Sequence, residues 1–234
     1  MCHSRTALLA LALVGCVKFE TSKGPGDYAL QFYGDPSCVA IETPGAALST
    51  LTLEGWIQAD KARELGPWPF LMWPGAMELF IDEDGRARFT DGTEARNGAS
   101  FPASWMDGEL HHIAGTWDGE TVRLFVDGTL QGFGAATLLS NASEQMYFGC
   151  HPFNQWYHKG ILDEVRISRG LRYTEDFTPV HADFVEDEET ISLWHFSEGS
   201  EAKTADAIGK AKGDLEAVDW VEFSLGDSGA DTGG

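Results

Sequence analysis

Two short stretches of the chain combine aromatic rings with polar side chains, as surfaces that bind sugars do. Residues 65–75 carry Trp68 and Trp73 among three prolines. In residues 153–158 the candidate contact side chains are Asn154, Trp156, Tyr157 and His158. Aromatic rings cover the C–H faces of a sugar, while amides and carboxylates bond its hydroxyl groups. Both stretches are therefore candidate carbohydrate contacts. The alternative is that their rings pack inside the fold, as large aromatic side chains usually do.

The carboxylates lack the spacing that glycoside hydrolysis needs. A retaining glycosidase holds two carboxyl groups about 5–5.5 Å apart, and β-sandwich hydrolases carry them in the pattern Glu-x-Asp-x-(x)-Glu. Glu78 and Asp82 have the wrong interval for this pattern. Asp163 and Glu164 are neighbours on one expected strand, so their side chains should point to opposite faces. The sequence also contains neither Gly-x-Ser-x-Gly nor His-Glu-x-x-His. We expect a protein that is not an enzyme.

The elements that would position these residues are strands. Asp118-Gly119 and Asp127-Gly128 fit two-residue type I′ turns, which would join three strands into an antiparallel meander. Alternating apolar and polar residues predict further strands at 28–32, 38–41, 51–59, 77–81, 87–89, 145–150, 161–168, 191–196 and 217–223. This is enough for two packed sheets, so the predicted fold class is an all-β, two-sheet antiparallel β-sandwich.

Two stretches are expected to form loops. Proline cannot donate a hydrogen bond into a ladder, so at least part of residues 65–75 should be an exposed loop or a sheet edge. Residues 90–103 are polar and contain glycine, which also predicts a loop.

Several segments, in their order and spacing, resemble the laminin-G-like (concanavalin A-like) jelly-roll family. They are YALQFYG at 28–34, LTLEGWIQA at 51–59, HHIAGTWDGETVRLFVDG at 111–128, GILDEVRISRGLRYTEDFTP at 160–179 and SLWHFSEGS at 192–200. The resemblance covers nearly all of residues 27–222. It implies a single jelly-roll domain over residues 27–223.

The resemblance also raises the expectation of a bound calcium ion, because many relatives hold calcium near the rim of a sheet. The pentraxin-type branch places its acidic and amide ligands just after the strand that here reads Tyr147-Phe148-Gly149. This chain has Cys150-His151-Pro152 there, so a pentraxin-like double site is not expected. Candidate oxygen ligands for a single site are Asp35, Asp60, Asn154 and Asp163. A structural capping role is the alternative for Asp163.

The N-terminal residues have the organisation of a cleaved export signal. Arg5 precedes an apolar run, 7–14, that is too short to cross a membrane. The sequence Leu-Val-Gly-Cys ending at Cys16 resembles the bacterial lipobox, in which the cysteine is lipidated. This implies a signal peptide at 1–15, a lipid anchor on Cys16 and a tether at 16–26. The alternative is an ordinary secretory signal.

The residue after the lipobox cysteine is Val17 rather than Asp. In Gram-negative lipoproteins this resembles the pattern that is sorted to the outer membrane. We therefore expect an exported, lipid-anchored protein at the outer membrane or cell surface. The low-complexity C-terminal tail, 224–234, is expected to be disordered.

Two cysteines remain once Cys2 has left with the signal and Cys16 has been acylated. In an oxidising compartment Cys38 and Cys150 are expected to form a disulfide. By the chain-entropy estimate, closing a loop of roughly 110 residues contributes about 4–5 kcal/mol. The alternative is a pair of buried free thiols.

The charge balance limits the partners. A formal net charge of −21 argues against binding nucleic acid or anionic lipid through a basic face. It suits neutral sugars, cations or basic partners. The sequence therefore predicts a non-catalytic binding module for a polysaccharide. The alternatives are a protein–protein adhesion or structural cell-envelope component and, third, an unrecognised glycoside hydrolase.

Overall fold

The computed structural model describes residues 28–43, 48–60, 67–93, 97–137, 143–151, 153–209 and 211–225. The strands are β1 (Tyr28–Tyr33), β2 (Cys38–Glu42), β3 (Leu51–Ala59), β4 (Trp68–Met72), β5 (Glu78–Ile81), β6 (Arg86–Thr90), β7 (Gly98–Pro102), β8 (Leu110–Trp117), β9 (Thr121–Val126), β10 (Thr129–Ala135), β11 (Gln145–Phe148), β12 (Cys150–His151), β13 (Trp156–Tyr157), β14 (Lys159–Arg169), β15 (Thr190–Trp194), β16 (Lys203–Ala205), β17 (Lys212–Glu216) and β18 (Val218–Glu222). Within these residues no helix is long and apolar enough to span a membrane.

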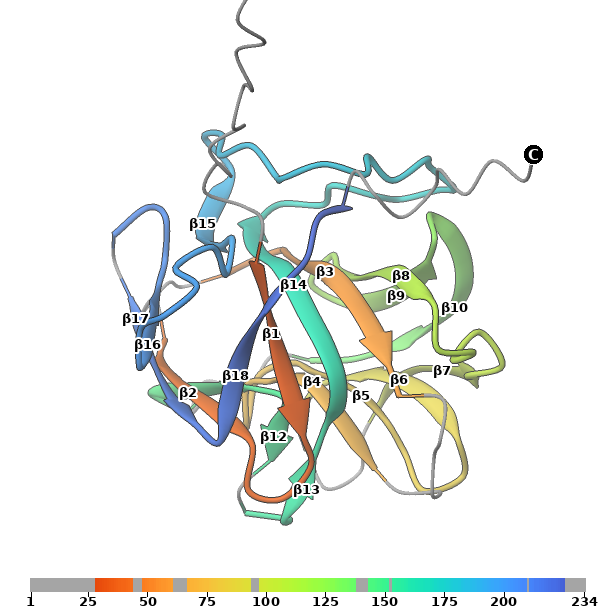
Figure 1. The fold of residues 1–234 in the computed structure, drawn as a ribbon. Coiled ribbons are helices and arrows are strands. Elements are labelled where there is room, and N and C mark those ends of the chain that lie inside the picture. The colour runs from red at the N-terminus through yellow and green to blue at the C-terminus, as the bar shows by residue number, and fades with distance from the viewer. Residues whose placement is uncertain are drawn as a thin grey trace, which may run out of the picture.

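The strands form two large antiparallel sheets and one small hairpin (Figure 1). Sheet A has the order β10-β9-β8-β3-β14-β1-β18, and β15 pairs with the end of β14. Sheet B has the order β16-β17-β2-β11-β4-β5-β6-β7, and β12 pairs with β13. The prediction of an all-β, two-sheet antiparallel sandwich is confirmed.

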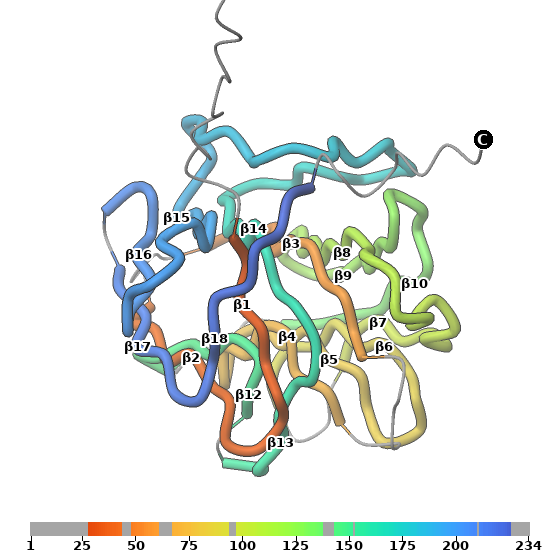
Figure 2. The backbone as a smooth tube through the Cα atoms, viewed as in Figure 1, coloured from red at the N-terminus to blue at the C-terminus, as the bar shows by residue number. Residues whose placement is uncertain are grey.

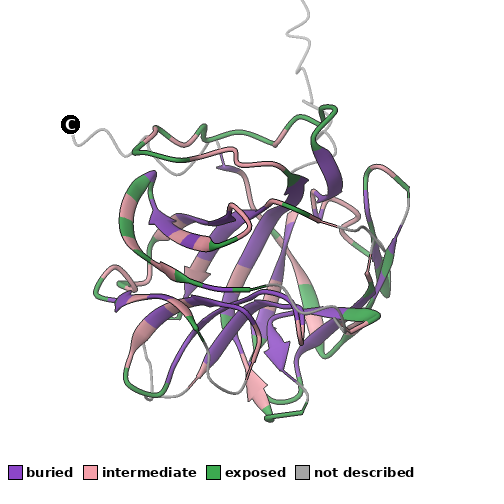
Figure 3. Cartoon of the chain, turned by 180° about the vertical axis from the view of Figure 1, so that it is seen from behind, coloured by how far each residue is buried: buried purple, intermediate pink, exposed green. Residues whose placement is uncertain are grey.

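The core lies between the inner faces of the two sheets. Alternation along β3 turns Leu51, Leu53 and Ile57 inward, where all three are fully buried. Figure 3 shows buried residues along most strands of both sheets. The close approach of the sheets depends on Gly115 of β8, since a Cβ there would lie 2.7 Å from the ring of Phe89 on β6.

The two predicted turns differ in their geometry. Asp127 and Gly128 both have positive φ, 48° and 75°, as a type I′ turn requires. In the β8–β9 turn, Asp118 occupies the first of the four turn positions instead of one of the two central positions. Its backbone N–H bonds to the carbonyl of Thr121, and its carboxylate accepts the N–H groups of Glu120 and Thr121. Asp118 therefore stabilises this turn from its first position, and the type I′ assignment there was wrong.

The two stretches predicted as loops both contain strands. Trp68–Met72 is the interior strand β4, between β11 and β5, and every residue in it is buried. Pro69 is tolerated because the pairing with β5 shifts register between Pro69 and Leu71. Within the predicted loop 90–103, Gly98–Pro102 pairs with β6 at the edge of sheet B as β7.

A long irregular connection, residues 170–189, crosses the outer side of sheet A between β14 and β15; we call it the strap (Figure 2). Phe177 donates its N–H to the carbonyl of Gly128 in the β9–β10 turn at 2.8 Å. The Asp176 carboxylate accepts the N–H of Leu130 at 2.8 Å. The strap therefore links the meander β8–β9–β10 to β14 and β15, which lie on the other side of β3 in the same sheet.

The ends of the chain fall largely outside the described residues. These comprise the predicted signal peptide at 1–15, the tether at 16–26 with Cys16, and residues 226–234 of the predicted tail. Leu225 is described and is 4% exposed, so packed structure reaches slightly beyond the predicted domain end at 223.

Candidate ligand-binding face

The β12–β13 hairpin folds over the outer face of sheet B. It begins where β11 ends, and it closes with the N–H of His158 on the carbonyl of Gly149 at 2.7 Å. A disulfide joins Cys150 to Cys38 of β2, with the two Cα atoms 5.1 Å apart. The predicted disulfide is thus confirmed, and it fixes the base of the hairpin to the sheet.

Aromatic rings connect the hairpin to the sheet and extend to its tip. Trp156 packs against Phe80 of β5, with ring centroids 5.6 Å apart, and against His151 at 5.4 Å. Phe153 at the tip has an edge contact with Tyr147 of β11 at 6.3 Å, yet it is 70% exposed. The hairpin thus presents one largely free ring beside two half-buried ones, Trp156 and Tyr157.

Polar groups lie next to these rings. Asn154 and Gln155 are exposed at the tip. The Asn154 backbone N–H bonds to the His151 carbonyl at 3.1 Å, and its side-chain amide nitrogen lies 3.3 Å from His151 Nε2. His151 Nε2 is also 3.7 Å from a carboxylate oxygen of Glu78, which is 5% exposed. The tip therefore offers rings for C–H contacts and amides that can bond hydroxyl groups.

The structure brings only part of the predicted contact set together. Asn154, Trp156 and Tyr157 share the hairpin. Trp68 and Trp73 are 6% and 4% exposed and belong to the core between the sheets. These two rings pack inside the fold, which was the alternative to a sugar contact.

His158 also lies in the interior. It is fully buried, and its ring has edge contacts with Phe32, Trp68 and Phe70 at 5.3–5.8 Å. Burial lowers its pKa to about 3, so the ring is neutral near pH 7. His158 lies at the base of the hairpin, inside the fold, and cannot contact a ligand at the tip.

Phe153 is the functional candidate that the sequence did not single out. Its neighbours in residues 153–158 carry amide, indole, hydroxyl or imidazole groups, whereas the sequence does not distinguish an exposed phenyl ring from a buried one. The proximity of His151 and Glu78 is likewise not predictable from the sequence, because only the fold brings β5 beneath the hairpin.

The outer face of sheet A carries a buried ionic cluster beneath the strap. The Glu54 carboxylate accepts hydrogen bonds from Arg166 Nε at 2.8 Å and from the Tyr173 hydroxyl at 2.7 Å, and it lies 3.3 Å from His112 Nε2. Burial by itself would raise the pKa of Glu54. The hydrogen bond with His112 and the charge of Arg166 outweigh burial and lower the pKa. The charge of Glu54 is thus neutralised within this cluster.

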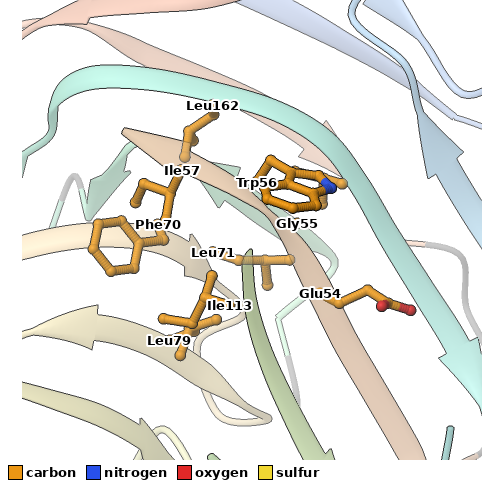
Figure 4. Close-up of a pocket in the computed structure, with 10 residues that line it drawn as sticks. Glu54, Gly55, Trp56, Ile57, Phe70, Leu71, Leu79, Ile113 and Leu162 are labelled. Atoms are coloured by element: carbon orange, nitrogen blue, oxygen red, sulfur yellow. The ribbon is translucent and has the colours of Figure 1, made fainter. Parts of the chain in front are cut away.

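Two cavities in the described residues offer little to a ligand. One, of about 20 Å³, lies between the sheets beside Gly55 (Figure 4). It is lined by Ile57, Phe70, Leu71 and other apolar side chains, and its volume fits about one water molecule. The other is an open groove of about 360 Å³ beside Asp60. Gln31 and Gln58, which line it, already donate to backbone carbonyls.

The expectation that Asp163 and Glu164 point to opposite faces was wrong. The pairing of β14 with β3 shifts register between Asp163 and Arg166, and Glu164 has a positive φ of 49°. Such a bulge interrupts the alternation of faces. The Glu164 carboxylate accepts the N–H of Phe184 in the strap at 2.6 Å, so it lies on the strap side, as Arg166 does.

Residues 35–176 match a laminin-G family model described as the concanavalin A-like lectin/glucanases superfamily. The matched span includes the hairpin and the start of the strap. No curated protein matches the chain.

Solved structures share this fold at low sequence identity. A Bacteroides ovatus protein, described as a candidate carbohydrate-binding protein, is 16% identical over 84% of this chain, with a TM-score of 0.64. Domains LG4-5 of the mouse laminin α1 chain are 15% identical over 66% of this chain, with a TM-score of 0.47. A SAP-like pentraxin from Limulus polyphemus is 14% identical, covering 66% of this chain and 79% of its own, with a TM-score of 0.46. This chain spans 60% of the Bacteroides ovatus chain and 45% of the laminin fragment.

Proposed function

The chain belongs to the concanavalin A-like lectin/glucanases superfamily, and from this premise we propose that it is a non-catalytic carbohydrate-binding module. Its contact surface is the tip of the β12–β13 hairpin. One observation carries the proposal: Phe153 is 70% exposed, beside the exposed amides of Asn154 and Gln155.

The hairpin is suited to this role because its base is rigid. The Cys38–Cys150 disulfide and the packing of Trp156 on Phe80 hold the tip in place before any ligand arrives. Binding to a pre-organised surface loses less conformational entropy than binding to a loop that must first be ordered. The similarity to a candidate carbohydrate-binding protein of Bacteroides ovatus supports the same reading.

The buried acidic residues support a non-catalytic role. Asp163 and Glu164 lie beneath the strap, 2% and 1% exposed, so their carboxylates are not presented to an external glycan. Near the hairpin, Glu78 faces His151, whereas Asp82 accepts a hydrogen bond from Arg88 Nε at 2.6 Å. These two carboxylates serve internal contacts with different partners.

A glycan array probed with the full chain in detergent micelles tests the proposal, with one arm containing calcium and one containing a chelator. Phe153→Ala should abolish the strongest signals. Phe133→Ala is the matched control, because Phe133 on β10 is 72% exposed and lies outside the hairpin. Binding lost in both variants, or in neither, would contradict the assignment to the hairpin. Loss of binding in chelator alone would add calcium to the proposal as a cofactor.

We also propose that residues 1–15 are removed and that Cys16 carries a lipid anchor at the outer membrane or cell surface. The support is the Leu-Val-Gly-Cys sequence behind an apolar run, followed by Val17. Stable anchoring needs more than one acyl chain, which a lipidated N-terminal cysteine supplies. Mass spectrometry of the mature N-terminal peptide should find acyl chains on Cys16. An unmodified N-terminus at any position would overturn this proposal.

A further inference from the structure

A second group of polar side chains meets on the opposite side of the molecule from the hairpin, where the strap leaves β14 and returns to β15. Glu164 comes from the bulge in β14, Asp183 from the strap and His195 from the residue directly after β15. One side-chain ligand atom from each lies within 4.8 Å of the other two. Three chain segments that are distant in sequence thus place two carboxylates and an imidazole together.

Two of the three ligand side chains are in direct contact, and the third is exposed. Glu164 Oε1 lies 2.6 Å from His195 Nδ1, and Glu164 Oε2 accepts the Phe184 N–H at 2.6 Å. Asp183 is exposed, and the His195 side chain is 29% exposed, so the group can be reached from solvent. Glu164 is held at two points, whereas Asp183 can adjust with the strap.

A third carboxylate lies directly beneath the group. Asp163 is 2% exposed, and one of its oxygens accepts the Glu164 N–H at 3.0 Å. Among the described residues no lysine or arginine forms an ion pair with these three carboxylates, and the ion-pair partner of Glu164 is His195.

Negative charge in excess of its counter-charges is costly at a site withdrawn from water, and a bound cation relieves it. In this group three carboxylates share one imidazole, that of His195, whereas two arginines pair with the single carboxylate of Glu54 in the other cluster. The donor set of one imidazole nitrogen and several carboxylate oxygens is the kind that binds zinc. Calcium prefers six to eight oxygen ligands, so the imidazole argues against it here.

We propose that Glu164, Asp183 and His195 bind one divalent transition-metal ion of the zinc class, with Asp163 as the adjacent buried carboxylate. Zinc ligands lie about 2.0–2.2 Å from the metal, so ligand atoms around a tetrahedral ion are roughly 3.3–3.6 Å apart. The 2.6 Å contact between Glu164 Oε1 and His195 Nδ1 therefore opens when the ion binds, and the exposed Asp183 moves toward it. The ion crosslinks the strap to β14 and β15. It is independent of the sugar contact on the hairpin.

The test is a zinc titration of the full chain in detergent micelles after removal of metals with a chelator. Competition with a chromophoric chelator measures affinity, and separate arms use calcium and magnesium. We expect one tightly bound zinc ion per chain and a higher melting temperature in its presence. His195→Ala and Asp183→Asn should each weaken zinc binding by at least about 100-fold, since loss of outer-shell partners alone costs 10–100-fold.

Two controls make the result specific. His111→Ala should leave the tight site unchanged, although His111 also lies between two carboxylates, those of Asp127 at 2.7 Å and Asp107 at 3.1 Å. Glu188→Gln is the control for an exposed acid on the strap. Because Asp183 is exposed, Asp183→Asn should fold even if His195→Ala does not. No retained zinc, zinc binding that survives both ligand substitutions, or binding of calcium in preference to zinc would each overturn the proposal.

Discussion

The outer faces of the two sheets are covered in opposite ways. On sheet A the strap lies across Trp56, Glu54 and His112, which are all at most 2% exposed. Tyr173 and Phe177 of the strap stack at 3.5 Å above this face. On sheet B the cover is a short hairpin, and its tip leaves Phe153 exposed.

This difference separates a stabilising surface from a binding surface. The strap buries the Glu54 cluster, whose charges are paired internally, so little of that part of the face is left for a partner protein or glycan. The hairpin is fixed at its base by a disulfide and by Trp156, and its free groups point outward. Substitutions on sheet A should therefore change stability, whereas substitutions at the hairpin tip should change binding.

The largest effect is expected at the base of the hairpin. Replacing Cys38 and Cys150 by serine opens a loop closed across 112 residues. The free energy of unfolding should fall by about 4 kcal/mol, because the unfolded chain gains conformational entropy. Denaturant titration with and without a reducing agent measures this loss. A double variant as stable as the oxidised parent would show that the strand pairing alone holds the hairpin.

The next effect tests the ionic cluster beneath the strap. Glu54→Gln leaves Arg166 buried without its carboxylate partner. Removing one member of a buried ion pair typically costs about 3–5 kcal/mol, and we expect about 3 kcal/mol here because Arg166 also bonds the Val185 carbonyl. Urea titration at pH 7 gives the value.

The pH dependence of that loss provides a second check. The pKa of Glu54 is lowered from its ordinary value of 4.5, so its stabilising contribution is present above pH 4.5. The contribution disappears as the pH falls through the folded-state pKa, because the parent carboxyl group then becomes protonated as well. The stability gap between parent and Glu54→Gln should therefore shrink below pH 4.5. A gap that stays constant to pH 3 would contradict the electrostatic explanation.

The alternating pattern of the sequence predicted the strands of the two sheets well. It predicted poorly the segments that cover their outer faces, the strap and the β12–β13 hairpin. Alternation along β3 correctly separated Leu51 and Leu53 from Glu54 and Trp56. It could not show that the strap buries the second set as well, because the strap has no periodicity of its own. The same limit applies to Trp68, since a tryptophan flanked by prolines looks like a loop until Pro69 is found at a register shift.

Local irregularity explains the other differences. The alternation rule assigned Asp163 and Glu164 to opposite faces, and a bulge brings both beneath the strap. The disulfide was predictable because the expected loss of Cys2 with the signal and the expected acylation of Cys16 leave only Cys38 and Cys150 to pair. The exposed ring of Phe153 was not predictable, because exposure depends on how far the hairpin extends beyond sheet B.

A smaller effect should follow from lifting the strap away from the meander. A Cβ at Gly128 would lie only 1.9 Å from the carbonyl oxygen of Phe177, and the φ of 75° at Gly128 also disfavours a side chain. Gly128→Ala should cost about 2 kcal/mol, combining 1–2 kcal/mol of backbone strain with displacement of the strap. Limited proteolysis should then cut within residues 170–189. Gly209→Ala, where a Cβ meets nothing within 4 Å, is the control for strain without a clash.

The smallest effect on stability is expected at the hairpin tip. It is also the most direct test of whether the tip is a binding surface rather than a stabilising one. Phe153→Ala removes a ring that is already 70% exposed, so unfolding should change by less than about 0.5 kcal/mol. Glycan binding should nevertheless be lost, since the ring is the largest free apolar surface on the hairpin. Thermal unfolding and binding are measured on the same preparation. A variant that loses stability and binding together would show that the tip belongs with the strap as a structural element, and the contrast between the two faces would fail.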